Sequence, residues 1–339
     1  MKRKKIIYTI LLVLLLVAGF FGWKIFGPTV SAPERKYFYI KTGETYSEVK
    51  AALLDQKIIS GDFFFDFLAK RLKYSNAVKP GRYEIRSMSV FSLVKMLRSG
   101  SQSPVNLIIT KLRTKEDLAQ KIGNNFECDS TDVINILDND DSLRKYGLDT
   151  NIAMTAVIPN TYAILWNTSA SRIFKKLVSE KDKFWNEERM KKANALNMTP
   201  DQVYTMASIV EEETNKEEDK GNIASVYLNR IHSGQRLEAD PTIKFALRNF
   251  GLKRIRSSHI DAAKASPYNT YFVKGLPPGP ICTPSSKTID AVLNAPATNY
   301  LFFVARPDRS GLSNFTSSYE EHMINAKNYQ RYLDSINIK

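Results

Sequence analysis

The chain has 339 residues, of which 43% are hydrophobic and 25% charged, and a formal net charge of +14 at pH 7. This composition excludes a disordered chain and, at roughly 150 residues per domain, allows about two soluble domains. The excess of Lys and Arg favours an anionic partner, such as nucleic acid, a lipid surface or an acidic polymer. The three histidines, His232, His259 and His322, form no metal-binding pattern, so we expect no metal site and no cofactor.

The N-terminus predicts a membrane anchor. Lys2 to Lys5 precede an unbroken apolar run from Ile6 to Trp23, and a helix needs about 20 residues to cross a bilayer. We therefore expect a cytoplasmic tail at 1–5 and a transmembrane helix at 6–26, because basic residues flank a span on its cytoplasmic side. The alternative is a signal peptide cleaved after Val30-Ser31-Ala32, although the apolar run exceeds the usual ~7–15 residues.

The next segment predicts small α+β modules. Strands are followed by helices that open with a capping box, in which a Thr and an acidic residue three positions later bond to each other's backbone. The expected elements are a strand at 37–40, a helix opened by Thr45 and Glu48, a turn and strand at 80–85, a helix from about 91 to 100, a strand at 105–109 and a helix opened by Thr114 that stops at Gly123.

The second half of the chain is richer in chemistry. Residues 101–198 form an intermediate, mostly helical region, with a turn expected at 159–162. Thr199, Pro200 and Gln202 then supply an N-cap, a proline at the first helical position and a capping-box glutamine, which predict a helix start. We expect a further domain at 199–339, with a second helix through 223–228, a buried strand at 300–305 and a closing helix at 319–333.

The helix that begins at Pro200 ends in three consecutive acids, Glu211, Glu212 and Glu213. Because successive helical residues lie about 100° apart, Glu212 is expected to face solvent with Lys216 as its partner, whereas Glu211 and Glu213 flank the apolar face. Partial desolvation there could raise the pKa of a carboxyl group and suit it to general acid catalysis. Helical geometry does not choose between Glu211 and Glu213, and a solvated helix end is the alternative interpretation.

Two other segments could contact a ligand. Tyr268 and Tyr271 enclose Asn269 and Thr270, and aromatic faces beside hydrogen-bonding groups would suit a sugar. Asp240 precedes Pro241 and is either a turn-initiating residue or a second catalytic carboxylate. Cys128 and Cys282 lie far apart, and the sequence leaves open whether they form a disulfide.

Five ordered motifs carry a resemblance to a known family. They are Ala207-Ser208-Ile209-Val210-Glu211-x-Glu213-Thr214, Ala224 to Arg230, Leu237-x-Ala239-Asp240-Pro241-Thr242, Ser266 to Tyr271, and Gly275 to Ile281. Together they look like the MltG (YceG-like) endolytic murein transglycosylases of bacteria. The resemblance implies an α+β chain with a membrane anchor, a small LysM-like α+β module at 37–100 that contains Pro80-Gly81-x-Tyr83, and a mixed α/β YceG-like catalytic domain at 199–339.

The resemblance also implies the roles of individual residues. The family's essential glutamate is taken to be the first acid after Ser-Ile-Val, which is Glu211 here. Substrate contacts are expected from motif residues, namely Asn229, Asp240, Thr242, Tyr268, Asn269, Thr270 and Tyr271. The chain departs from the family pattern at Asn160, where an Asp is usual, and at Ser313, where a His is usual.

The implied function is that of a membrane-anchored endolytic lytic transglycosylase. Such an enzyme would cleave the MurNAc–GlcNAc β-1,4 bond of nascent peptidoglycan strands to give 1,6-anhydroMurNAc ends, with Glu211 as general acid and base. It would reside in the bacterial inner (cytoplasmic) membrane, with the catalytic domain in the periplasm or on the outer face. Peptidoglycan synthases are a further expected partner, and nucleic acid is not.

Two alternatives stay open at this point. A muramidase-type hydrolase would use two carboxylates, Glu211 and Asp240, because hydrolytic glycosidases need an acid together with a base or nucleophile. A non-catalytic anchor would use the LysM-like module only to bind peptidoglycan.

Overall fold

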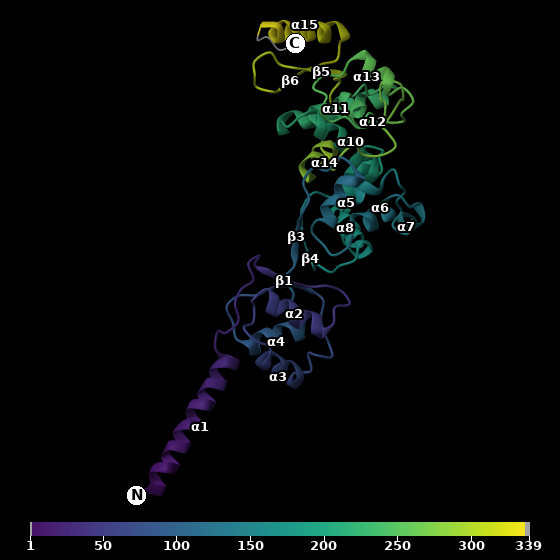
Figure 1. Cartoon of the computed structure of the whole chain (residues 1–339). Coiled ribbons are helices and arrows are strands. Elements are labelled where there is room, and N and C mark those ends of the chain that lie inside the picture. The colour runs from purple at the N-terminus through teal and green to yellow at the C-terminus, as the bar shows by residue number, and fades with distance from the viewer. Residues whose placement is uncertain (1, 336–339) are drawn as a thin grey trace. The chain divides into compact units, whose positions relative to one another are not determined.

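The computed structural model describes residues 2–335 and divides the chain into two compact units (Figure 1). Of the described residues, unit 1 comprises 2–107, 125–128 and 163–169, and unit 2 comprises 108–124, 129–162 and 170–335. The region 101–198, predicted as a separate intermediate segment, is shared between these two units.

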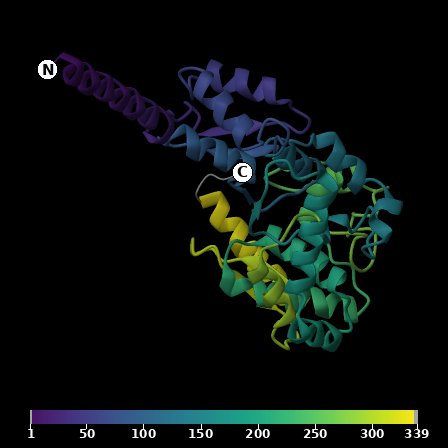
Figure 2. The same ribbon diagram turned by 90° about the horizontal axis from the view of Figure 1, so that it is seen from below.

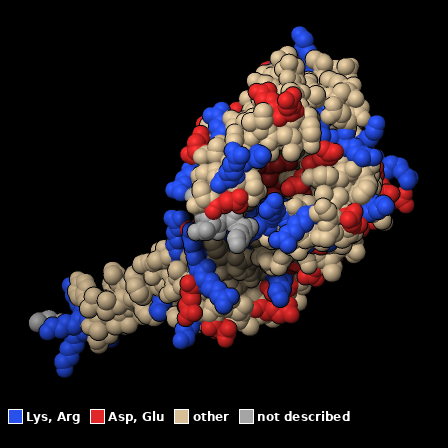
Figure 3. Space-filling model, turned by 90° about the horizontal axis from the view of Figure 1, so that it is seen from above, with Lys and Arg blue, Asp and Glu red and all other residues tan. Residues whose placement is uncertain are grey.

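Unit 1 begins with a long apolar helix, α1 (Lys2–Phe26). Within residues 2–335 it is the one helix that is long and apolar enough to cross a membrane, and its side chains are not buried in protein. Figure 3 shows it as a rod of uncharged atoms with basic atoms at its free end. The predicted span at 6–26 ends where α1 ends, whereas α1 itself starts earlier and includes the basic cluster.

The rest of unit 1 is a two-stranded antiparallel sheet with three helices. Strand β1 (Tyr37–Ile40) pairs antiparallel with β2 (Gly81–Glu84), and Phe38 lies opposite Tyr83. The helices are α2 (Tyr46–Asp55), α3 (Phe63–Arg71) and α4 (Val90–Ser99). Strands β1 and β2 and helices α2 and α4 confirm predicted elements, including both halves of the Thr45–Glu48 capping box and the stop of α4 at Gly100, whose φ of 71° favours glycine. Helix α3 was not predicted.

A second pair of strands was predicted only in part. Strand β3 (Val105–Ile108) pairs with β4 (Thr161–Ile164). The turn expected at 159–162 was therefore wrong in its second half, because Thr161 and Tyr162 belong to a strand. The backbone N–H of Ile109 also donates to the carbonyl of Asn160 at 2.8 Å, which continues the ladder beyond β3.

Unit 2 is mainly helical. Its elements are α5 (Lys115–Gly123), α6 (Ser130–Leu137), α7 (Asp140–Arg144), the 3₁₀ helix η1 (Ala153–Ala156), α8 (Ala170–Phe184), α9 (Glu187–Ala195), α10 (Pro200–Glu213), α11 (Glu217–His232), α12 (Asp240–Ala246), α13 (Ser257–Ala262), α14 (Ser286–Leu293), β5 (Phe302–Ala305), β6 (Ser313–Thr316) and α15 (Tyr319–Ser335). The capping boxes predicted at Thr114 and Thr199 are both present.

Helix α10 lies at the centre of the unit 2 core. Every residue from Val203 to Val210 is buried, and α10 packs against α9, α11, α12 and α14. A helix that is buried all round has no solvent face. The three acids at its C-terminal end are therefore placed by the neighbouring elements and not by a single apolar stripe.

The C-terminal elements of unit 2 form a small layer. Strands β5 and β6 make an antiparallel hairpin in which Phe303 lies opposite Phe315, and α15, yellow in Figures 1 and 2, packs against both strands. The prediction of a buried strand at 300–305 was correct in type and wrong in burial, because all four residues of β5 are half-buried.

Candidate functional site

The three acids at the end of α10 lie in three different environments. Glu212 was expected to face solvent beside Lys216, and the structure corrects this prediction. Its carboxylate accepts two hydrogen bonds from Arg113, at 3.1 and 3.0 Å, and lies 3.2 Å from Lys111 Nζ, with only 12% of the side chain exposed. Despite desolvation, these cations lower the pKa of Glu212. Glu212 thus joins α10 to the segment before α5.

Glu211 lies on another side of the helix, where three side chains donate to one of its carboxylate oxygens. Its Oε2 is 3.3 Å from Lys220 Nζ on α11 and accepts hydrogen bonds from Ser285, at 3.2 Å, and from Thr288 on α14. The Lys220 side chain is 4% exposed and also contacts Glu217 at 2.7 Å. An ammonium and two hydroxyls are donors that a carboxylate oxygen can accept from. Glu211 therefore links α10, α11 and α14.

Glu213 differs from both neighbours because it has few polar partners. Its Oε1 accepts a hydrogen bond from the Tyr227 hydroxyl at 2.5 Å. The pKa of Glu213 rises from 4.5 to about 7, chiefly because of desolvation and also because of the negative charge of Asp240, while the Tyr227 hydrogen bond and the positive charge of Lys244 oppose the rise. A carboxyl group with such a pKa carries a proton at mildly acidic pH and can release it near neutrality.

Glu213 also lines a cavity of about 340 Å³. The lining combines carboxylates, aromatic rings and cationic or imidazole groups: Glu213, Tyr227, Arg230, Leu237, Glu238, Asp240, Tyr271, Phe302, Phe303, Tyr319 and His322. Two of the acids in this cavity, Glu213 and Asp240, were singled out in the sequence, whereas Glu211 does not line it.

Asp240 lies in this cavity, but not in the turn that we considered for it. It is the first residue of α12, with Pro241 at the next position, and its Oδ1 accepts a hydrogen bond from the Tyr271 hydroxyl at 2.6 Å. Burial raises the pKa of Tyr271 well above its ordinary value, and the bond to Asp240 adds to this effect, so the phenol stays protonated as a donor. Asp240 and Tyr271 thus present one joined polar edge to the cavity.

Three other predicted substrate contacts make hydrogen bonds within the protein. Asn229 Nδ2 donates to the carbonyls of Thr298 and Tyr300, both at 2.9 Å. Thr242 and Thr270 are almost fully buried and share a hydrogen bond of 2.9 Å. These three residues hold the loops behind the cavity and do not line it.

The remaining two predicted contacts lie near Tyr271 in the chain. Asn269 is fully buried; its Nδ2 donates to the carbonyl of Ile260 at 2.9 Å, and its Oδ1 accepts from the backbone of Tyr271 at 3.0 Å. Tyr268 packs on Phe245 with ring centroids 4.7 Å apart. Asn269 therefore positions Tyr271, and Tyr268 is half-buried and packs against the unit 2 core.

Sequence reasoning named Glu213, Asp240 and Tyr271 as site candidates and missed the other residues that line the cavity, among them Tyr227, Arg230 and His322. Tyr227 and Arg230 lie one helical turn apart in the motif 224–230, a spacing that places both on one face of α11, and the motif was used only for the resemblance. His322 comes from α15 and stacks on Phe302 at 5.1 Å. Arg230 Nε and His322 Nδ1 are both buried and make no hydrogen bond with the described residues. No local sequence pattern predicts that a residue of α15 lies in the same cavity as the end of α10.

The two departures from the family pattern lie elsewhere. Ser313 lines a separate cavity of about 580 Å³, and its backbone N–H donates to the buried Asp219 at 2.7 Å. Asn160 belongs to the β3–β4 region, where its side chain accepts from the backbone of Thr161 at 2.7 Å. Neither residue lines the cavity of Glu213.

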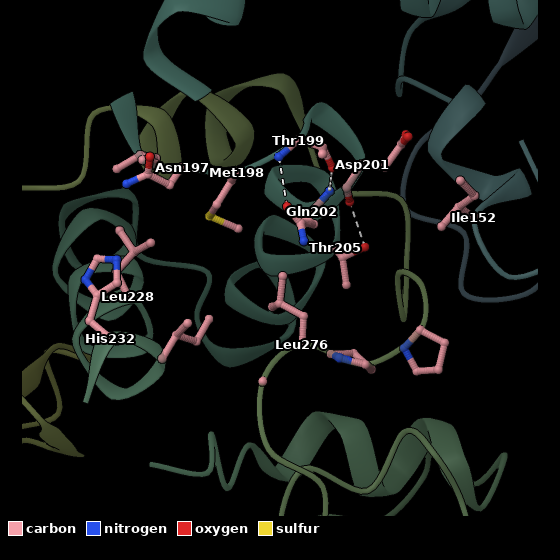
Figure 4. Close-up of a pocket in the computed structure, with 15 residues that line it drawn as sticks. Ile152, Asn197, Met198, Thr199, Asp201, Gln202, Thr205, Leu228, His232 and Leu276 are labelled. Carbon is pink, nitrogen blue, oxygen red and sulfur yellow. Dashed lines mark hydrogen bonds between the residues drawn. The ribbon is translucent and has the colours of Figure 1, made fainter. Parts of the chain in front are cut away.

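A larger cavity of about 600 Å³ surrounds the start of α10 (Figure 4). Figure 4 shows Leu228 and His232 on one side of it and Ile152 on the other, and the loop with Leu276 and two prolines crosses it. Its carboxylate, Asp201, is paired with Lys181 at 2.8 Å. This cavity therefore lacks an acid like Glu213.

Among residues 2–335, no group of three or more His, Cys, Asp and Glu residues is arranged to hold a metal ion.

Comparison with known proteins identifies the family. The model of the YceG-like family matches residues 38–328. The chain belongs to the YceG-like family. It is 28% identical to a protein of Bacillus subtilis named endolytic murein transglycosylase, over 88% of this chain and 85% of the relative. A Streptococcus pneumoniae protein of the same name is 26% identical over 93% of this chain, which spans only 63% of that relative.

A solved structure supports the same family. The crystal structure of a YceG-like protein from Listeria monocytogenes matches 86% of this chain and 99% of its own length, with a TM-score of 0.57 and 26% sequence identity. The YceG-like fold predicted from the five motifs is thus confirmed.

The raised pKa of Glu213 predicts a pH-dependent stability difference. Between pH 4.5 and about 7 the folded state binds more protons at Glu213 than the unfolded state does, so stability at this site falls as pH rises. We expect the wild type to lose up to ~3 kcal/mol relative to Glu213→Gln across this window, and nothing further above it. Denaturant unfolding at several pH values measures this difference.

The exposed Glu218 on α11 provides a matched control. Glu218→Gln should follow the wild type at each pH. Parallel stability curves for Glu213→Gln and the wild type would contradict the raised pKa.

Proposed function

We propose that this chain is a lytic transglycosylase that cleaves the glycan of peptidoglycan and is anchored in a membrane by α1. Family membership and the names of its relatives support the activity. The observation that carries the proposal is a carboxyl group with a pKa of about 7 in a cavity lined by aromatic rings. That combination supplies a proton donor next to surfaces that suit sugar rings.

We propose Glu213, in place of Glu211, as the general acid and base. A general acid must reach the substrate and carry a proton near the working pH. Glu213 lines the cavity and has the raised pKa, whereas Glu211 is occupied by Lys220 and two hydroxyls and does not line it. The assignment of Glu211 rested on the resemblance alone, and the environments of the two acids favour Glu213.

The proposed reaction needs one carboxyl group. Protonated Glu213 donates its proton to the glycosidic oxygen between MurNAc and GlcNAc, and the bond from C1 of MurNAc to that oxygen breaks. The C6 hydroxyl of the same MurNAc attacks C1 and passes its proton to the Glu213 carboxylate. The products are a 1,6-anhydroMurNAc end and a free GlcNAc hydroxyl, and the enzyme regains its proton without water.

The neighbouring side chains suit this cycle. The Tyr227 hydroxyl donates to Glu213 and keeps the other carboxyl oxygen, Oε2, available to a substrate. The oxygen atoms of the hydrogen-bonded pair Tyr271 and Asp240 can accept hydrogen bonds from sugar hydroxyls. The rings of Phe302 and Tyr319 offer apolar faces. Arg230 lines the same cavity and pairs there with Glu238 at 2.6 Å, so its guanidinium is held by a carboxylate of the protein.

The alternative activity is hydrolysis with two carboxylates. The pair first considered, Glu211 and Asp240, is disfavoured because Glu211 does not line the cavity. Glu213 and Asp240 share the cavity, so a muramidase would have to use these two. Asp240 is bonded to Tyr271, and that contact favours a positioning role for Asp240.

We also propose the cellular setting predicted from the sequence. The basic residues before α1 favour a cytoplasmic N-terminus, with both units in the periplasm or on the outer face of the bacterial cytoplasmic membrane. Nascent glycan strands would then be the substrate and peptidoglycan synthases the partners. Peptidoglycan binding by a LysM-like part of unit 1 stays a prediction, as does a role for unit 1 as a non-catalytic anchor.

We expect substitutions of Glu213 and Glu211 to have different effects on glycan cleavage. Glu213→Gln removes the proton donor and keeps the side-chain shape, so the cleavage rate should fall by about 10²–10⁴-fold. Glu211→Gln should retain activity within about tenfold, because it alters only a structural contact. Cleavage of purified sacculi by the full-length variants in detergent measures both rates.

Folding of the two variants is checked by circular dichroism and thermal unfolding. A folded, active Glu213→Gln variant beside a folded, inactive Glu211→Gln variant would restore Glu211 as the acid.

Product mass separates the lyase from the hydrolase. We expect wild-type products to carry anhydro ends, which are lighter than reducing ends by one water. Asp240→Asn should lower the rate without changing the product, because Asp240 positions Tyr271 and the substrate. Mass spectrometry that finds only reducing ends, together with loss of all cleavage in Asp240→Asn, would support the hydrolase.

A further inference from the structure

Unit 1 exposes an aromatic face on α3. Phe65, Leu68 and Ala69 point into the core, whereas Phe63 and Phe67 are 65% and 55% exposed. These two residues lie one turn apart and so share a face of the helix. Such neighbouring exposed rings are unusual in a soluble domain and indicate a surface that contacts something apolar.

The same face continues into basic residues. Lys70 and Arg71 follow Phe67 by three and four positions, which places them on the next turn of that face, and both are exposed. Lys50 lies 3.5 Å from Asp62, the N-cap residue of α3, and 3.0 Å from Asp66, so one cation offsets part of the negative charge beside this face. Aromatic rings followed by cationic side chains are typical of helices at a membrane surface.

Contacts between α1 and α3 link this face to the membrane segment. Phe64 on α3 packs edge-on against Phe21 of α1, with ring centroids 5.5 Å apart, and Phe63 packs on Phe64 at 5.2 Å. Phe21 lies five residues before the end of α1, which is about 7–8 Å along the helix axis. If Phe26 marks the end of the span, Phe64 lies at the depth of the outermost apolar layer of the bilayer.

The end of α1 is docked and not loosely linked. Ile25 packs against the unit 1 core, and Phe26 contacts Phe91 with ring centroids 5.5 Å apart. Directly after the helix, the backbone of Val30 donates to Met88 at 3.0 Å and that of Ser31 to Ile58 at 2.9 Å. Unit 1 therefore cannot swing away from the membrane without breaking these contacts.

We propose that the α3 face formed by Phe63, Phe64 and Phe67 is a second membrane contact, inserted into the headgroup and acyl boundary of the bilayer that α1 spans. Lys70 and Arg71 face the lipid headgroups, where anionic lipids strengthen the contact. The contact fixes the height and tilt of unit 1 above the bilayer. It rests on the proposed membrane anchoring by α1 and is independent of the proposed glycan chemistry.

Quenching of tryptophan by lipids brominated in their acyl chains tests this contact in the full-length protein reconstituted into nanodiscs. In a Trp23→Phe background, Phe67→Trp places a reporter on the face, and its exposure means that the larger ring needs no space in the core. We expect brominated lipid to quench this reporter to an extent comparable with native Trp23. Tyr39→Trp, on β1 beside Trp166, is the aromatic control and should keep its emission.

The outcomes separate the possible failures. Strong quenching of Trp23 in the wild type without quenching of Phe67→Trp would overturn the second contact and leave the anchor intact. Absence of Trp23 quenching would overturn the anchor itself, and neither result bears on glycan cleavage. Emission of Phe67→Trp that responds to protein concentration and not to brominated lipid would mean that a second copy of the chain covers this face, which also overturns the proposal.

Discussion

The account depends on the desolvation of one carboxyl group at the end of a buried helix. Glu213 lies three positions beyond eight consecutive buried residues of α10, and within the described part of the chain its side chain accepts a hydrogen bond from the Tyr227 hydroxyl. Neutral donors stabilise a carboxylate less than cations do, so burial prevails and the pKa rises to about 7. The acid can therefore both give and take a proton at the pH where a cell wall is built.

The neighbouring acids are neutralised by cations, and this leaves Glu213 as the exception. Glu212 is held by Lys111 and Arg113, and Glu211 by Lys220, so each adds to the stability of the unit 2 core at the end of α10. In the proposed function, the three adjacent glutamates divide into two ion-paired residues and one reactive group. The division arises because α10 is enclosed on all sides, and each carboxylate meets a different neighbouring element.

Much of the fold could be predicted from local signals, and the site only in part. Capping boxes at Thr45, Thr114 and Thr199 marked helix starts correctly, because a cap depends on residues close in sequence. The helical wheel failed for Glu212, since it assumed one apolar face on a helix that is buried all round. His322 reaches the cavity from the last helix, a contact that depends on tertiary packing and leaves no local pattern.

The most direct test of the central claim is the pH profile of kcat/KM for the wild type and Tyr227→Phe. The alkaline fall in the wild type should lie near pH 7, where Glu213 loses its proton. The Tyr227 hydrogen bond lowers the pKa of Glu213, so its removal should move this fall to higher pH. If kcat/KM of a folded Tyr227→Phe variant fell at the same alkaline pH as that of the wild type, this would contradict the assignment of Glu213 as the acid.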